Sequence, residues 1–168
     1  MCLSGTNLTH TYYMQTLITF LVRGEEFAID AGQVAGIRDI SHLLADSRSS
    51  EDVLRAVGTA YPEYECYIMH TCLGMTMNYI QPNTQMITLD SADAPAGFIV
   101  DGIADLLAVE AKELRYLVYQ RLPRRGIAEI RGVFFRDVYL QLIDIRQILT
   151  ELRRPRDEPE YQPASMDR

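Results

Sequence analysis

The chain has 168 residues, of which 48% are hydrophobic, and its formal net charge is −7. This length supports one domain with its own core, and an acidic chain lacks the basic face that nucleic-acid binding requires. No segment approaches the ~20 apolar residues of a membrane span, and the start lacks the pattern of a secretory signal. The three cysteines show no framework spacing, which indicates reduced thiols. We expect a soluble, cytoplasmic protein without nucleic acid and without direct membrane insertion.

The first half of the domain is predicted to begin with a hairpin. Residues 1–13 are polar and aperiodic, so we expect a flexible N-terminus and an ordered domain that starts at Met14. Residues 16–22 and 27–30 flank a short link with a glycine, and this pattern is typical of two paired strands. Residues 34–40 predict a further extended segment.

A helix and a β-prone region follow. Ser49 can cap free amides and the acidic pair Glu51 and Asp52 suits the positive end of a helix dipole, so a helix should begin here. Pro62 should end it within about three turns. Residues 64–72 and 74–80 are rich in residues that favour strands, so we expect them to be extended.

The second half predicts two more hairpins and two helices. Residues 86–90 pair with 96–100, and residues 133–135 pair with 138–143, in each case around a short polar link. Residues 110–120 are expected to form a helix. The chain then ends in an amphipathic helix, because Ile145, Ile148, Leu149 and Leu152 recur at helical spacing. The charged, proline-containing segment 153–168 is expected to be a disordered tail.

A catalytic or metal centre is not indicated. Cys66, His70 and Cys72 could supply three zinc ligands, but a fourth ligand is missing nearby and the spacing is unusual for zinc. No third group marks a Cys–His nucleophile pair. We interpret Asp101 as the end of a strand and Asp105 as the start of a loop rather than as an acid and base. We therefore expect no catalytic residue, no metal and no cofactor.

Three blocks of sequence together resemble a known family. They are residues 25–38, residues 100–107, and Ile130-Arg131-Gly132 with the later run 139–145. In this order and spacing they resemble the CheW-like domain, the adaptor of bacterial chemotaxis arrays. The resemblance covers residues 14–152 and implies a mostly-β fold of two intertwined, five-stranded SH3-like β-barrels with a short inserted helix and a C-terminal helix.

The resemblance also implies partners and docking residues. The family is non-enzymatic and bridges methyl-accepting chemoreceptor tips to a CheA-type histidine kinase. The kinase face would comprise Val34, Ile37, Arg38 and Ile40. The receptor groove would comprise Leu73, Gly74, Met75, Val100 and Ile103.

One turn departs from the family pattern. Typical members carry Asn-Leu-Arg-Gly where this chain has Thr71-Cys72-Leu73-Gly74. The receptor-side arginine is therefore replaced by Leu73, and the preceding segment 41–65 is also unusual. This departure resembles the divergent adaptors of pilus- or gliding-linked pathways. Two alternatives stay open: a structural or inhibitory paralogue that binds a single partner and caps a signalling assembly, and a small metal-binding or thiol enzyme built on Cys66, His70 and Cys72.

Overall fold

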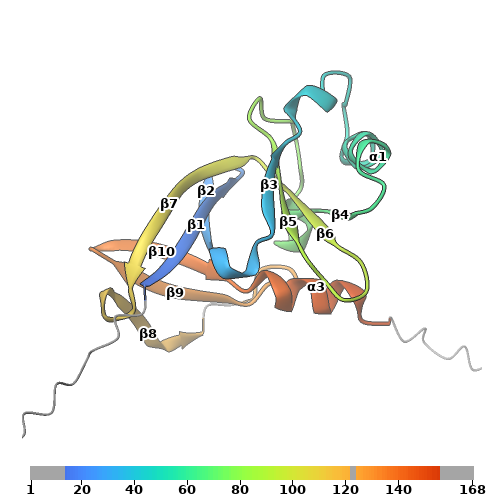
Figure 1. Cartoon of the computed structure of the whole chain (residues 1–168). Coiled ribbons are helices and arrows are strands. Elements are labelled where there is room, and N and C mark those ends of the chain that lie inside the picture. Colours follow the sequence, from blue (N-terminus) through green and yellow to red (C-terminus); the bar gives the residue numbers. More distant parts are fainter. Residues whose placement is uncertain (1–13, 122–123, 156–168) are drawn as a thin grey trace, which may run out of the picture.

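The computed structural model describes residues 14–121 and 124–155, which form two β-sheets with few helices (Figure 1). The larger sheet contains β1 (Met14–Val22), β2 (Glu25–Asp30), β7 (Gly102–Glu110), β8 (Leu114–Arg121), β9 (Ile130–Phe135) and β10 (Val138–Ile143). The smaller sheet contains β3 (Gly36–Asp39), β4 (Glu65–Ile68), β5 (Gln85–Leu89) and β6 (Ala96–Val100). The helices are α1 (Ser50–Ala60), α2 (Met69–Cys72) and α3 (Ile145–Arg153), with 3-10 turns η1 (Ala31–Gln33), η2 (Ser41–Leu43) and η3 (Ala111–Glu113).

The order of the strands makes the two sheets interlock. The larger sheet runs β7-β1-β2-β10-β9-β8, and the smaller runs β3-β5-β6-β4. All strands of the smaller sheet lie between β2 and β7 in sequence, whereas the larger sheet closes when β10 pairs in parallel with β2, placing Gln141 beside Phe27. The expected mostly-β class of two intertwined units, with an inserted and a C-terminal helix, is therefore confirmed. By hydrogen bonding, six strands form one sheet and four form the other.

A single core cluster holds the two sheets together. It joins Phe20 of β1 and Phe27 of β2 to Ile87 and Phe98 of the smaller sheet, and all four are fully buried. Ile148 packs into the same cluster from α3. Burying apolar side chains of this size contributes about 1.5–3 kcal/mol each, so the seam between the sheets is a main source of stability.

Helix α1 covers the other face of the smaller sheet, and in Figure 1 it lies on the outer side of that sheet. Its Val53 and Val57 pack with Ile68, Met86 and Ile99 in a separate core cluster. The helix begins as expected, because the Ser49 side chain accepts from the Asp52 amide and the Asp52 carboxylate accepts from the Ser49 amide.

The three predicted hairpins are confirmed. β1 pairs with β2, β5 with β6, and β9 with β10, each antiparallel. The last of these turns on Arg136 and Asp137, whose φ angles of 46° and 67° match the left-handed conformation of a tight hairpin turn. The predicted amphipathic helix is likewise confirmed as α3.

Two segments expected to be extended are not strands. Residues 69–72 form α2, because Met69, Cys72 and Leu73 have helical spacing and all three contact the main core. Within a short apolar run, this spacing is hard to separate from a strand pattern. Residues 74–80 pair with no strand, and Met77 and Ile80 instead pack against the cluster beneath α1.

The prediction of a helix at residues 110–120 was wrong. The chain leaves β7, passes through η3 and continues as β8, which pairs with β9. Asp105, expected at the start of a loop, is an exposed residue within β7 beside Thr19 of β1. These pairings join residues distant in sequence, and such contacts commonly override local preference.

The first and last elements of the described structure are β1 and α3. β1 begins at Met14, while α3 extends to Arg153, one residue past the expected boundary. The expected flexible segment 1–13 and the remainder of the expected tail, 156–168, lie outside the described residues. Across the described ranges, no helix is long and apolar enough to cross a membrane.

Candidate functional site

The four residues of the expected kinase face divide between the surface and the core. Ile40 is fully buried beneath α1, and Val34 packs partly buried against the main core. Ile37 is 38% exposed and Arg38 is also exposed. Successive residues of a strand point to opposite faces of the sheet. A single partner can therefore contact both Ile37 and Arg38 only along the edge of the sheet. β3 is such an edge strand, because β5 is its only neighbour in the described sheet.

Arg38 is held by two tyrosines from the unusual segment. Its guanidinium carbon lies 5.3 Å from the ring centre of Tyr61 and 5.6 Å from that of Tyr64. Its Nη2 donates to the Tyr64 hydroxyl at 3.2 Å, and this hydrogen bond raises the pKa of Arg38. The two rings meet edge to face, 6.4 Å apart. Sequence reasoning found Arg38 but missed both tyrosines, which flank Pro62 at the end of α1.

The expected receptor groove is also divided. Leu73 and Val100 lie in the main core, with 2% and 0% exposure. Gly74 is exposed, while Met75 and Ile103 are partly buried against the core. Leu73 thus lies inward, in contrast to the receptor-side position expected for this turn. The glycine of the turn is required here, because Gly74 has a φ of +68°.

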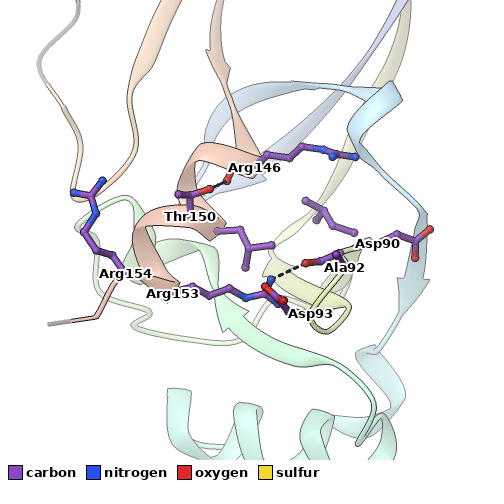
Figure 2. A pocket seen from close by; sticks show the side chains of 10 residues that line it. Asp90, Ala92, Asp93, Arg146, Thr150, Arg153 and Arg154 are labelled. Atoms are coloured by element: carbon purple, nitrogen blue, oxygen red, sulfur yellow. Dashed lines mark hydrogen bonds between the residues drawn. The ribbon is translucent and has the colours of Figure 1, made fainter.

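A cleft of about 790 Å³ opens between α3 and the loop after β5 (Figure 2). Leu89 and Leu149, both buried members of the main core, contribute apolar lining. The remaining lining residues are polar, charged or small: Asp90, Ser91, Ala92, Asp93, Arg146, Thr150, Arg153 and Arg154. The sequence analysis missed this cleft, although arginines on the polar side of the predicted last helix were a visible signal.

Arg153 fixes one end of the cleft, and Figure 2 shows its side chain reaching toward the loop. Its guanidinium donates to Ser91 Oγ at 2.7 Å, to the Ala94 carbonyl at 2.7 Å and to Glu65 Oε2 at 2.9 Å. The hydrogen bond from Arg153, followed by that from Tyr67, lowers the pKa of Glu65. The last residue of α3 thereby ties the helix to β4 and to the loop between β5 and β6.

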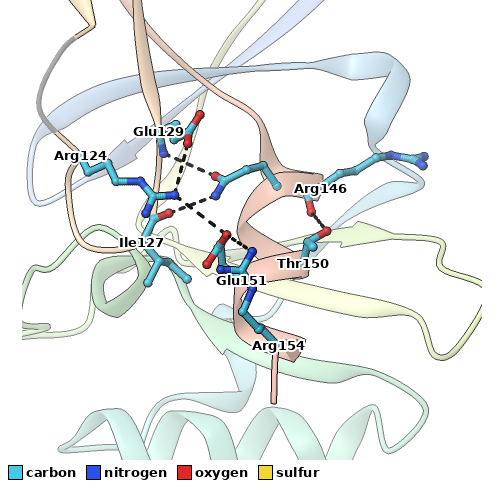
Figure 3. Close-up of polar contacts among 8 residues, drawn as sticks. Arg124, Ile127, Glu129, Arg146, Thr150, Glu151 and Arg154 are labelled. Atoms are coloured by element: carbon cyan, nitrogen blue, oxygen red, sulfur yellow. Dashed lines mark hydrogen bonds and ion pairs between the residues drawn. The ribbon is translucent and has the colours of Figure 1, made fainter. Parts of the chain in front are cut away.

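A polar network holds the other side of α3 against the loop before β9 (Figure 3). Gln147 Nε2 donates to the Ile127 carbonyl at 3.3 Å. Arg124 contacts Glu129 at 3.2 Å and Glu151 at 4.0 Å. These contacts, with those of Arg153, orient the exposed face of α3 that borders the cleft.

The geometry and burial of Cys66, His70 and Cys72 do not suit a reactive centre. Burial raises the pKa of the Cys72 thiol to about 12 and also raises that of Cys66, whereas a reactive thiol needs a lowered pKa. The described residues contain no group of three or more side chains suited to a metal ion. His70 instead lies buried with its Nε2 3.1 Å from Asp101 Oδ1, a close contact without hydrogen-bond alignment. Asp101 Oδ2 accepts from the Arg23 amide at 2.6 Å, which connects the pair to the turn between β1 and β2.

The fold and these surfaces define a β-rich protein of two interlocked sheets, with an exposed edge at β3 and a cleft beside α3. The CheW-like domain matches residues 16–153, so the chain belongs to the CheW-like domain family, whose members are non-enzymatic adaptors of chemotaxis signalling. The structure is similar to that of the scaffolding protein TtCheW from Thermoanaerobacter tengcongensis, with a TM-score of 0.55 and 11% sequence identity, over 79% of this chain and 90% of that one. No curated protein sequence matches the chain.

Proposed function

We propose that the chain is a chemosensory adaptor that couples chemoreceptors to a CheA-type histidine kinase. The family match over residues 16–153 is the observation that carries this proposal. An adaptor of two proteins needs two separate docking faces. The free edge of β3, with Ile37 and Arg38 exposed, and the cleft beside α3 supply two candidates on different parts of the surface.

The cleft suits the helical tip of a receptor. The cleft of about 790 Å³ lies open at the surface beside α3, so an amphipathic helix can rest along it without being enclosed. Its lining by Leu89 and Leu149 with charged residues at the margin is the arrangement by which grooves bind amphipathic helices. In this proposal the receptor contacts the cleft beside α3.

Separate titrations with the kinase regulatory domain and a receptor-tip helical hairpin, both from the same genome, test the proposal. The natural chain should bind both and should form a ternary complex. Ile37→Asp places a charge at the β3 edge and should weaken only the kinase. Ala92→Trp fills the exposed margin of the cleft and should weaken only the receptor. Each variant is thus the control for the other, and absence of binding to both partners refutes the proposal.

The burial of Leu73 favours a second candidate function, an adaptor paralogue that binds one partner and caps a signalling assembly. Because Leu73 lies in the core, no side chain at this position replaces the receptor-side arginine of ordinary members. Binding of the kinase domain without binding of the hairpin is the result expected for this candidate. The same departure leads us to place the adaptor in a pilus- or gliding-linked pathway, so its deletion should impair surface motility and leave swimming intact.

A further inference from the structure

The guanidinium of Arg38 is fixed in position with most of its hydrogen-bonding capacity unused. A guanidinium has five N–H donors, and in the described structure one hydrogen bond joins it to protein, the bond to Tyr64 Oη. No carboxylate of the described residues forms an ion pair with it, although Glu63 acts on it through space. Arginine pairs best with a carboxylate through two parallel hydrogen bonds, and two such donors remain available here.

The two tyrosines that hold Arg38 are themselves fixed. Tyr61 and Tyr64 are the first and last residues of a turn closed by a hydrogen bond from the Tyr64 amide to the Tyr61 carbonyl at 3.1 Å. Pro62 occupies the second position of this turn, where its fixed φ is favourable. Both rings also pack against the cluster beneath α1. Ordering a long side chain opposes binding, and here the protein has already ordered it.

The position of Arg38 on an edge strand favours a partner segment in an extended conformation. Arg38 lies on β3, whose second edge has no neighbouring strand in the described sheet, and Ile37 is exposed on the opposite face of the same strand. A strand added along this edge would bring its side chains alternately to the two faces. An acidic residue would then meet Arg38 while its neighbour, if apolar, would meet Ile37.

From this geometry we infer that Arg38, Tyr61 and Tyr64 form a preorganised carboxylate-binding site for an aspartate or glutamate on an extended segment of the kinase regulatory domain. This inference rests on the proposed function, because it takes the kinase as the partner. It adds the chemistry of recognition and assigns a role to the turn at residues 61–64.

Binding of the kinase regulatory domain to matched arginine variants tests the site. Arg38→Gln should weaken binding at least 10-fold, and Arg38→Lys should weaken it about 5-fold because lysine keeps the charge but lacks two parallel donors. Tyr64→Phe, which keeps the ring and removes the hydroxyl, should cause a 2- to 5-fold loss. The control is Arg48→Gln, which makes the same change of charge at an exposed arginine ten residues later in the chain. It should change binding less than 2-fold. Thermal melts should show all variants folded.

A double-mutant cycle then locates the carboxylate. Each exposed Asp or Glu of the kinase domain is changed to its amide and tested with the natural chain and with Arg38→Gln. The inference requires one position at which the two losses are not additive. Equal binding by Arg38→Gln and Arg48→Gln, or additive losses at every position, overturns the inference and leaves the proposed function standing. Absence of kinase binding by the natural chain overturns both.

Discussion

Leu73 and Gly74 are neighbours in sequence, but they occupy opposite environments at the end of α2. Leu73 packs in the core, while Gly74 is exposed and makes the left-handed turn. The inward direction of Leu73 could be read from sequence only as an alternative, because a leucine at an exposed turn and one at a buried turn have the same local pattern. Contacts distant in sequence decide between them.

Leu73→Arg is therefore expected to destabilise the domain. The change places a charged group among the buried residues of the main core, and the loss should be about 3–5 kcal/mol, at the upper end of the range for large core substitutions. Leu73→Met, which conserves volume, should cost less than about 1.5 kcal/mol. Urea unfolding measures both. Equal stability of the arginine variant, with tighter binding of a receptor tip, would show that residue 73 faces the partner.

Gly126 is expected to be much less tolerant of alanine than Gly24. Both have a positive φ, +59° and +77°, so both substitutions incur the left-handed penalty of about 1–2 kcal/mol. A Cβ at Gly126 would also lie 2.4 Å from the Cys72 carbonyl oxygen and 2.5 Å from the Gly74 nitrogen, whereas at Gly24 nothing lies within 4 Å. Overpacking should add about 1–3 kcal/mol. Chemical denaturation compares the two variants, and similar losses would mean that the 126 loop does not press on the turn after α2.

The same loop is joined to the first hairpin by an ion pair. Arg125 makes a bidentate contact with Glu25 of β2, and its guanidinium carbon lies 5.6 Å from the ring centre of Phe27. The hydrogen bond from Arg125 lowers the pKa of Glu25 below its usual value. The loop before β9 therefore has a defined attachment, which its glycine and arginines do not reveal by pattern.

This ion pair predicts a pH-dependent contribution to stability. Because the folded pKa of Glu25 is lowered, the contribution is present above the unfolded pKa of about 4.3 and is lost as pH falls through the folded pKa. Both side chains are partly solvent-exposed, so Glu25→Gln should cost only about 0.2–1 kcal/mol at pH 7, and the difference from the natural chain should shrink below about pH 4. Denaturation at pH 7 and pH 3 measures it. Glu26→Gln is the neighbouring control, and an undiminished difference at pH 3 contradicts the assignment.

At the scale of elements, the sequence predicted the parts that are local. Hairpins with short links, the capped start of α1 and the amphipathic α3 all follow from residues close together in the chain. Other elements depend on contacts with residues far away in the chain, so their local composition did not predict their structure. They are strand β8, helix α2 and the unpaired run 74–80. The proposed docking surfaces divide in the same way: Ile37 and Arg38 could be named from the family pattern, but the cleft and the two tyrosines arise from tertiary contacts.

At the scale of the whole molecule, the extent of the domain can be tested by truncation. We expect residues 14–155 to melt within about 4 °C of the full chain, because both removed segments lie beyond the first and last elements, β1 and α3. Residues 14–152 should melt lower than residues 14–155, since they lack Arg153 and the three hydrogen bonds that it donates. Arg153→Gln in the full chain is the control for that loss. A drop above about 8 °C for 14–155 would show that one end is docked.

The interlocking of the two sheets also sets an order in which the protein can be completed during synthesis. The smaller sheet uses residues 36–100 only, so all its strands are synthesised before β8, β9 and β10. Strand β2 can pair with β10 only after β10 has been synthesised, more than a hundred residues later. Arg153, whose hydrogen bonds tie α3 to the smaller sheet, is synthesised later still. Until translation ends, the nascent chain exposes the apolar faces of β1 and β2 and the unpaired side of β2. The period of greatest risk of aggregation is therefore the synthesis of the final third of the chain.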